Sequence, residues 1–209
     1  MCLTALLIAT AASAQSSRPG PYVLDVRGVM AAAPSGPGFY PPVSSTTSVP
    51  NRGFGLDLGL HLYPLQLGAA RLGVGVDAMR TRGSSSTPAV AGTTAATSTF
   101  ASSAAMNVTS VSGQVSFNFG TRDGWSYLSA GYGGLRTLSE VSSDVLGPIQ
   151  HSDVSLKRKG AAINYGGGAR WFIKERLATV FDVRFYRMGA EGSLPGGRVF
   201  SLSAGVSVR

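Results

Sequence analysis

Cysteine is nearly absent from the sequence, since the 209 residues include only Cys2. It lies in the opening stretch "MCLTALLIATAASAQ", where an apolar run at residues 3–9 is followed by Ala12-Ser13-Ala14, a pattern that precedes secretory cleavage sites. We therefore predict a signal peptide at residues 1–14 and a single mature domain at residues 15–209, whose fold is argued below. Because the cysteine would leave with the signal peptide, the mature chain could form neither a disulfide framework nor a cysteine metal site.

Charged residues are also scarce, at 13% of the chain, which is about half of their usual share in soluble domains. No stretch approaches the roughly 18 consecutive apolar residues that a membrane-spanning helix needs. The 18 Lys and Arg outnumber the 10 Asp and Glu and give a net charge of +8, but they are scattered singly apart from Lys157-Arg158-Lys159. Together with the export signal, this scatter argues against a nucleic-acid partner. The phosphates of lipid headgroups are the more natural anionic partner.

Apolar and polar residues alternate with period two in eight segments, a pattern that predicts β-strands. Each predicted strand has about 9–11 residues, the length that a tilted strand needs to cross a bilayer. The segments are YVLDVRGVM (22–30), GFGLDLGLHLY (53–63), RLGVGVDAM (71–79), SVSGQVSFNF (110–119), WSYLSAGYGGL (125–135), AINYGGGARWF (162–172), LATVFDVRFYR (177–187) and VFSLSAGVSVR (199–209). In the least clear of them, residues 125–135, we assign Leu128, Ala130 and Tyr132 to the apolar face.

The links between these segments alternate between short and long. Short links are predicted at residues 64–70, around Asp123-Gly124 and around "IKER"; long links cover residues 31–52, 81–106 and 137–159, and a shorter one covers 188–197. Short turns at one end and long loops at the other are typical of bacterial outer-membrane barrels. An even number of strands would place both termini at the short-turn end, which is periplasmic in such barrels.

Two architectures share this strand pattern and differ in which face points inward. A soluble lipocalin-like barrel would bury the leucines, whereas a membrane barrel would turn them outward. The polar face is rich in glycine rather than Lys or Glu, and a narrow eight-stranded interior requires small residues beside its few large ones. The apolar faces carry no charge through their middles, where one Arg would cost about 2–4 kcal/mol in lipid. We therefore predict an all-β fold, an eight-stranded antiparallel up-and-down transmembrane β-barrel.

The polar faces carry acids and bases in similar numbers, a mixture that suits a closed interior crossed by ion pairs and hydrogen bonds. Aromatic residues such as Phe54, Phe119, Tyr132, Trp171 and Phe200 stand at the ends of the apolar faces, as interfacial girdles do. We predict a polar network inside the barrel formed by Asp25, Arg27, Asp57, His61, Arg71, Asp77, Gln114, Asn164, Arg170, Asp182 and Arg184.

Segments such as "GGGARWF", "FDVRFYR" and the final "FSLSAGVSVR", with the secretory start and the eight alternating strands, resemble the small OmpA/OmpX-like outer-membrane β-barrel family. The resemblance covers essentially all of the mature chain. It implies an integral protein of the bacterial outer membrane, inserted by the outer-membrane assembly machinery, which reads the last strand. In that family the last residue is usually aromatic, whereas this sequence ends with Arg209.

An enzymatic role would require a site such as a His/Ser/acid triad, because some small outer-membrane barrels modify lipids. The sequence has two histidines. His61 belongs to a polar face near the periplasmic end of its strand, the wrong end for chemistry on outer-leaflet lipid, and we expect it to hydrogen-bond inside the barrel. His151 lies in "HSD" within a long link, where sequence neighbours do not make a preorganised triad. We therefore predict no catalytic residues, no metal site and no cofactor.

Basic residues gather at the strand ends that face the long links, where they would form a collar at the extracellular rim. Outer-leaflet lipopolysaccharide presents phosphates at this height, and Arg and Lys are suited to bind them. Solvated strand ends that simply tolerate charge are the alternative explanation. The residues of this predicted rim are Arg52, Arg80, Arg82, Arg136, Lys157, Arg158, Lys159, Arg187 and Arg198.

The sequence as a whole favours a monomeric, non-enzymatic protein with a structural or surface-interaction role exerted through long extracellular loops. A small channel or carrier for a hydrophobic solute is one alternative, although the lumen of an eight-stranded barrel is normally filled by side chains. A lipid-modifying enzyme is the other. The expected partners are outer-membrane lipid, in particular lipopolysaccharide, and the assembly machinery.

Overall fold

The computed structural model describes residues 22–32, 34, 38–41, 47–68, 70–89, 101–121, 124–145, 150–190 and 196–209. The predicted signal peptide at residues 1–14 and the side chain of His151 lie outside this part, so the statements about them stay predictions. Among the described residues, no helix is long and apolar enough to cross a membrane.

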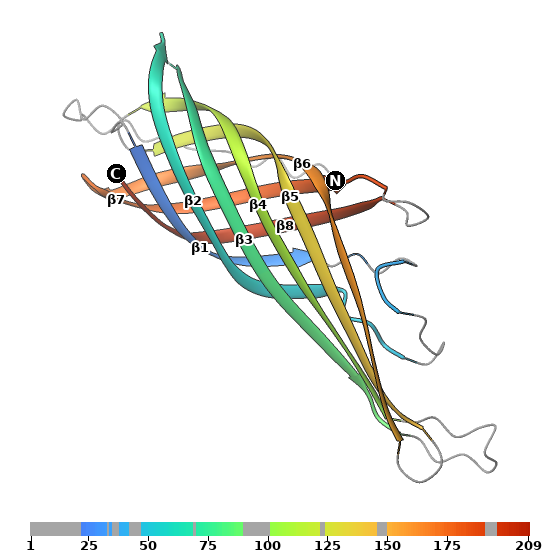
Figure 1. The fold of residues 1–209 in the computed structure, drawn as a ribbon. Helices are drawn as coiled ribbons and strands as arrows, with labels where there is room; N and C mark the ends of the chain where they lie inside the picture. Colours follow the sequence, from blue (N-terminus) through green and yellow to red (C-terminus); the bar gives the residue numbers. More distant parts are fainter. Residues whose placement is uncertain are drawn as a thin grey trace, which may run out of the picture.

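In the described part of the chain, eight antiparallel strands form a closed barrel in chain order (Figure 1). β1 pairs with β8 from Leu24 opposite Val208 to Ala32 opposite Phe200, so the sheet closes on itself. The predicted fold class and the place of the last strand are therefore confirmed. The strands are β1 (Tyr22–Ala32), β2 (Arg52–Leu67), β3 (Ala70–Thr87), β4 (Ser102–Thr121), β5 (Gly124–Val145), β6 (Gln150–Lys174), β7 (Leu177–Met188) and β8 (Gly197–Val208).

Side chains alternate between a packed lumen and an exposed outer wall. Arg27 on β1 is fully buried, whereas Leu58 and Leu60 on β2 are 48% and 49% exposed. Leu128 and Tyr132 also point outward, as predicted for the least clear strand. The leucines thus face away from the lumen, which agrees with a membrane barrel and excludes the lipocalin-like alternative. An apolar wall of this extent is stable against lipid and unfavourable in water.

At the end where β1 begins and β8 finishes, consecutive strands follow one another closely. β6 ends at Lys174 and β7 begins at Leu177. The predicted link at residues 64–70 is wrong in its first half, because β2 continues to Leu67. The β2–β3 register shifts between Leu62 and Leu65, and Pro64 lies within that shift. Proline has no N–H to donate to the ladder, so strands accept it at such irregularities.

Strands β3–β6 extend beyond the rest of the barrel at the opposite end (Figure 1). The β2–β3 pairing reaches only to Phe54 opposite Arg82, and the β6–β7 pairing only to Ala162 opposite Met188. The four strands β3–β6 stay paired to their tips. We call this extension the wing; it consists of residues 83–87, 102–106, 139–145 and 150–156.

The wing corrects two predicted long links, residues 81–106 and 137–159, because strands occupy both ends of each. It also corrects the predicted strand length, since β4, β5 and β6 have 20, 22 and 25 residues. In the wing Ser and Thr stand on both faces of the sheet, so the alternation of polarity disappears although the pairing continues. The inward face at the base of the wing stays buried, at Ala104, Met106 and Val141.

The links predicted at residues 31–52 and 188–197 agree with the strand bounds to within two residues, because β1 ends at Ala32, β2 begins at Arg52, β7 ends at Met188 and β8 begins at Gly197. Residues 33, 35–37, 42–46 and 191–195 of these links lie outside the described part.

We expect even one methyl group added inside the narrow lumen to destabilise the barrel where neighbouring strands approach closely. A Cβ added to the inward-facing Gly205 would lie 2.0 Å from the carbonyl oxygen of Val26, whereas the nearest atom to one added at the outward-facing Gly28 is the oxygen of Ala204 at 3.8 Å. Gly205→Ala should lower the free energy of unfolding by about 1–3 kcal/mol, and Gly28→Ala should leave it unchanged. Urea titration in lipid vesicles, followed by tryptophan fluorescence, measures both; equal effects would contradict this packing.

Candidate functional site

Arg27 lies at the centre of the lumen, surrounded by carboxylates from four strands. Its Nη2 atom is 2.6 Å from Asp77 Oδ2 and 2.9 Å from Asp57 Oδ2. Its Nη1 atom is 3.8 Å from Asp25 Oδ2 and 3.9 Å from Asp182 Oδ2. All five side chains are at most 3% exposed. Buried charges are tolerated only when they are paired in this way.

Arg170 on β6 and Arg184 on β7 extend the network across the lumen. Arg170 donates to both carboxylate oxygens of Asp25, from Nε to Oδ1 at 3.0 Å and from Nη2 to Oδ2 at 2.6 Å. This bidentate geometry makes the strongest guanidinium–carboxylate pairs. The hydroxyl of Ser207 on β8 donates to the same Oδ1 atom at 2.5 Å. Asp25 is therefore held from two further strands.

Arg184 connects the carboxylates to a set of neutral polar side chains. Its Nη2 atom lies 3.2 Å from Asp182 Oδ2 and donates to Ser129 Oγ at 3.1 Å, and its Nη1 atom donates to Asn164 Oδ1 at 3.0 Å. Gln114 on β4 donates from Nε2 to the same Asn164 oxygen at 2.8 Å. Each of the eight strands therefore contributes a side chain to the network, which crosses the lumen and fills it.

Of the eleven residues predicted for the interior, ten are buried, and Arg71 is only half-buried near the start of β3. Sequence reasoning missed Tyr127, whose hydroxyl donates to Asp182 Oδ2 at 2.7 Å. The Cζ atom of Arg170 lies 4.2 Å from the centre of the Tyr127 ring. The signal was present, because Tyr127 alternates with the outward-facing Leu128.

The network contains one more carboxylate than guanidinium group, since Asp25, Asp57, Asp77 and Asp182 face Arg27, Arg170 and Arg184. Asp25 contacts Arg27 and also holds Arg170 in a bidentate pair, whereas Asp57 and Asp77 are each paired with Arg27 alone among these bases. Asp57 is the more distant of the two, at 2.9 Å from Arg27 Nη2 against 2.6 Å for Asp77. We therefore assign the excess negative charge to Asp57.

This assignment predicts different costs for two isosteric changes. Asp57→Asn should change the free energy of unfolding by less than about 1 kcal/mol, because it leaves three carboxylates against three guanidinium groups. Asp25→Asn should lower it by about 3–5 kcal/mol, because Arg170 would stay buried without its charge partner. Urea unfolding in lipid vesicles tests both variants, and equal losses would show that the excess charge is not at Asp57.

On the wing side of the network the lumen becomes apolar and is closed by two residues of the β1–β2 link. Phe39 and Tyr40 are both buried there. Ser139 donates from Oγ to the Phe39 carbonyl at 2.5 Å, and the Tyr40 hydroxyl donates to the Pro50 carbonyl at 3.1 Å. Burial raises the pKa of Tyr40 to about 12, so the hydroxyl stays protonated. The apolar residues around them include Val108, Leu135, Met79, Met106 and Met188.

Arg158 corrects the predicted rim, because it faces the lumen and is only 2% exposed. Its guanidinium carbon lies 4.3 Å from the centre of the Phe39 ring, and its Nη1 atom donates to the Gly38 carbonyl at 3.3 Å. Lys157 and Lys159 on either side are exposed. A basic tripeptide in a strand necessarily spans both faces, and the middle residue here holds the β1–β2 link.

Aromatic residues close the opposite end of the lumen. Tyr63, Trp125 and Phe172 pack together, with the Trp125 and Phe172 ring centres 4.9 Å apart. The Cζ atom of Arg209 lies 4.5 Å from the Phe172 ring centre and 6.0 Å from that of Trp125. Arg209 thus takes the predicted inward register. The described lumen is therefore occupied by side chains at both ends and in the middle.

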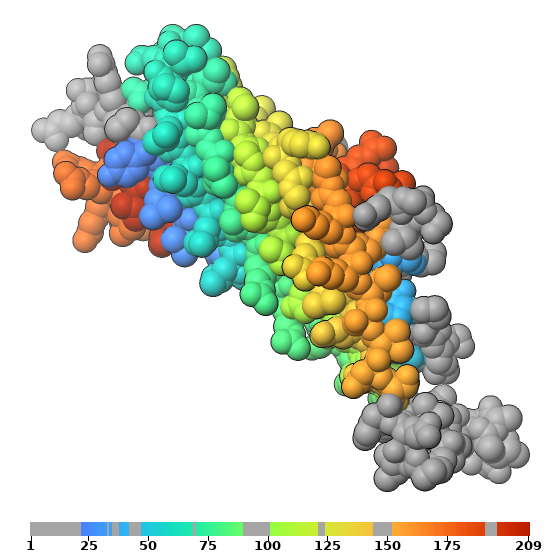
Figure 2. Space-filling model, in the orientation of Figure 1, coloured from blue at the N-terminus to red at the C-terminus, as the bar shows by residue number. Residues whose placement is uncertain are grey.

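The other eight predicted rim residues, Arg52, Arg80, Arg82, Arg136, Lys157, Lys159, Arg187 and Arg198, are exposed. Strand register brings five of them into two neighbouring rows on the outer wall over β3–β6, the surface that faces the viewer in Figure 2. The first row consists of Arg80, Thr109, Arg136 and Lys159, and the second of Arg82, Asn107, Leu138 and Lys157. We call these two rows the basic rows.

Like charges stand directly opposite each other at two places on this wall. Arg136 on β5 lies opposite Lys159 on β6, and Arg187 on β7 lies opposite Arg198 on β8. Directly opposed like charges destabilise an antiparallel sheet. Neither pair serves the internal packing of the barrel, because all four side chains are exposed.

The histidines offer no recognisable reaction centre in the described part of the chain. His61 on β2 faces the lumen of the barrel and is 1% exposed. Its ring stacks on that of Tyr63, with the two ring centres 6.4 Å apart. No group of three His, Cys, Asp or Glu among the described residues is arranged to hold a metal ion. The described side chains inside the barrel bind the strands together, and the exposed basic residues lie on the outer wall.

Comparison with known proteins gives matches to solved structures, while no family model and no curated protein matches the sequence. Neisserial surface protein A superposes with a TM-score of 0.50 at 16% identity, over 90% of this chain and 97% of that one. The chain has the fold of a small eight-stranded outer-membrane β-barrel. The other matches include Ail, the attachment invasion locus protein of Yersinia pestis, with a TM-score of 0.45 at 13% identity over 89% of this chain and 95% of that one. The outer membrane protease OmpT of Escherichia coli matches with a TM-score of 0.48 at 9% identity over 76% of this chain and 64% of that one.

In a barrel of this kind the apolar wall meets lipid, so the position of the basic rows can be given relative to that wall. The row that precedes them along β3–β6 consists of Ala78, Val111, Gly134 and Ala161, all without charge. The first basic row lies two residues further along each strand, about 6.8 Å beyond this uncharged row, and the second basic row lies two residues beyond the first. The barrel therefore changes from apolar to cationic within one step along the same outward face.

Proposed function

We propose that this protein is a non-enzymatic, integral protein of the bacterial outer membrane that displays the wing at the cell surface. Its basic rows bind the phosphates of lipopolysaccharide in the surrounding outer leaflet. The barrel, closed by the pairing of β1 with β8, acts as a monomer. Its role is that of a structural or surface-interaction protein anchored to the lipid around it.

The observation that carries this proposal is the opposition of like charges on the outer wall. Arg136 faces Lys159, and Arg187 faces Arg198, with no carboxylate opposite any of them in the register. A sheet that keeps such pairs loses stability unless an anion lies between them. Phosphate accepts charge-assisted hydrogen bonds from two cations at once. The basic rows also stand one step beyond the apolar wall, where headgroup phosphates lie.

The orientation follows from the same placement. If the basic rows lie at the outer leaflet, the wing projects from the cell, and the start of β1 and the end of β8 lie at the periplasmic side. Short turns on that side match the usual arrangement of such barrels. We further propose that the outer-membrane assembly machinery inserts the chain and reads β8, the strand that closes the barrel.

Removing one opposed pair should weaken the binding of lipopolysaccharide while relieving repulsion. We expect Arg136→Ser with Lys159→Ser to reduce affinity for lipopolysaccharide at least tenfold. In vesicles of zwitterionic phospholipid alone, the same variant should be as stable as the wild type or slightly more stable. Lipopolysaccharide retained after purification, together with binding to added lipopolysaccharide, measures the first effect; urea unfolding measures the second.

The matched control removes two exposed bases at the other end of the barrel. Lys174→Ser with Arg176→Ser makes the same change in net charge, and both residues are exposed. This control should retain lipopolysaccharide like the wild type. Unchanged retention by the Arg136/Lys159 variant, or an equal loss in the control, would overturn the proposal.

A second candidate is a channel or carrier for a hydrophobic solute, which the apolar side chains packed around Phe39 favour. The ion-pair network crosses the lumen below these side chains, so an open path would require the network to separate. Single-channel recording in planar bilayers distinguishes the two candidates. We expect no conductance from the wild type, and none from Phe39→Ala, because the network remains in place. Steady conductance that rises in Phe39→Ala would favour the channel instead.

An enzyme that modifies lipids has weaker support than either candidate. His61 is enclosed in the lumen and cannot meet a lipid at the outer wall without opening the barrel. We therefore assign the protein a binding role.

A further inference from the structure

The outward face of β3–β6 changes its chemistry in a fixed order from the barrel to the tip of the wing. Beyond the apolar row and the two basic rows, the next row consists of Ser84, Ala105, Glu140 and Ser155. The row after that consists of Ser86, Ser103, Ser142 and Asp153. Cations thus give way to hydroxyl and carboxylate groups along one continuous surface.

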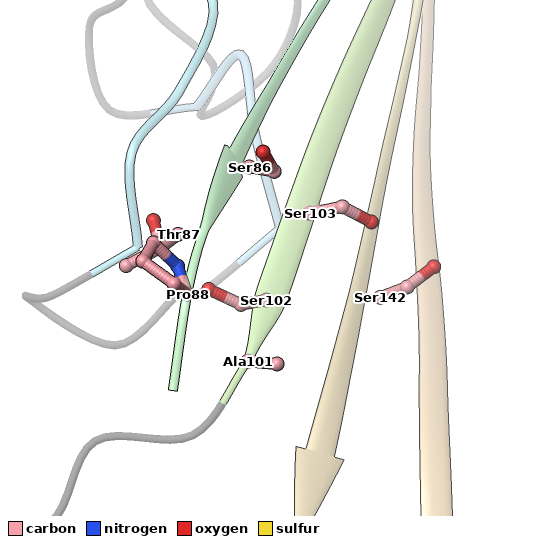
Figure 3. A pocket seen from close by; sticks show the side chains of 7 residues that line it. All are labelled: Ser86, Thr87, Pro88, Ala101, Ser102, Ser103 and Ser142. Carbon is pink, nitrogen blue, oxygen red and sulfur yellow. The ribbon is translucent and has the colours of Figure 1, made fainter. Parts of the chain in front are cut away.

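Two shallow depressions lie in these last rows. The first has a volume of about 520 Å³ and is lined by Ser86, Ser103 and Ser142 of three neighbouring strands, together with residues at the ends of β3 and β4 (Figure 3). The second has a volume of about 380 Å³ and is lined by Glu140, Asp153 and residues beside them on β5 and β6. Ser142 lines both. The depressions therefore adjoin and form one surface.

The groups on this surface suit a neutral polyol better than an anion. Serine hydroxyls both donate and accept hydrogen bonds, and the carboxylates of Glu140 and Asp153 accept them from sugar hydroxyls. The same carboxylates would repel a phosphate placed beside them. The cross-strand row from Ser86 to Asp153 spans three strand spacings, or about 14 Å, so it can contact more than one sugar ring.

Lipopolysaccharide has the same order of chemistry along its length, with acyl chains, then phosphates and acidic sugars, then neutral sugars. We propose that the surface formed by Ser86, Ser103, Glu140, Ser142, Asp153 and Ser155, which we call the wing face, is a subsite for the neutral core sugars of a lipopolysaccharide molecule whose phosphates occupy the basic rows. This inference rests on the proposed function and adds to it a site for the saccharide. The wing is then the part of the fold that binds the saccharide outside the membrane.

The test compares two forms of lipopolysaccharide, one with a complete core and one that lacks the heptoses and everything beyond them. We expect the wild type to bind the complete form about tenfold more tightly, as a few additional hydrogen bonds would produce. Ser103→Val with Ser142→Val should abolish this preference without weakening the binding of the truncated form. Valine keeps the strand propensity of both positions. Native mass spectrometry of the barrel in lipid nanodiscs measures the two affinities.

A matched control and a second variant separate binding from folding. Ser126→Val changes an exposed serine of β5 at the other end of the barrel, and it should keep the preference. Glu140→Gln with Asp153→Asn keeps the shape of the wing face but removes both carboxylates, and it should reduce the preference. A shift in gel migration between heated and unheated samples reports whether each variant is folded.

The outcomes for this inference and for the proposed function differ. Equal binding of both forms by the wild type, or a preference retained by both wing-face variants, would overturn the subsite and leave phosphate binding by the basic rows intact. Failure of the wild type to bind either form would overturn the proposed function and the subsite together.

Discussion

The contacts between Arg27 and its four carboxylates fix the register of the barrel, and the other features of the structure depend on that register. Alternation of polarity decides only which face of a strand points inward, so a slip by two residues would keep the outward-facing leucines in lipid. Such a slip would leave Asp57 or Asp77 displaced from Arg27 and a charge buried without a partner. The ion pairs therefore specify the strand register, which the apolar wall does not determine. The bidentate pair between Asp25 and Arg170 likewise fixes the position of β6.

Once the register is set, the chemistry of the outer wall follows from it. Arg80, Arg136 and Lys159 occur in different strands, far apart in the chain, and only their pairing through Thr109 brings them into one row. The lumen balances acids against bases within contact distance, whereas this row collects charge of one sign. The interior is therefore neutralised by the protein itself, and in our proposal the phosphates of lipopolysaccharide have the same effect on the basic rows.

Much of the fold and of the interior network could be predicted from the sequence, because a closed barrel in lipid forces inside and outside to differ in polarity. Asp25, Arg27, Asp77 and Arg184 stand on polar faces that any reading of the alternation identifies. The partners of each charge could not be predicted, since they depend on the shear of the barrel. Arg158 was misplaced for a related reason, because its inward direction is apparent only when the strand is known to continue beyond the lipid. The burial of Phe39 depends on the path of a link that carries no periodic signal.

The wing shows what the loss of alternation means in a protein of this kind. On β3 the outward residues change from Val76 to Arg80 and Arg82 and then to Ser84 and Ser86, while the pairing with β4 continues without a break. The period-two pattern therefore ends where the sheet leaves the lipid, and the strand itself ends later. In a membrane barrel the end of the alternation marks the membrane surface. A Ser- and Thr-rich segment that follows it can still be a strand, with an outward face available to whatever lies against the outer leaflet.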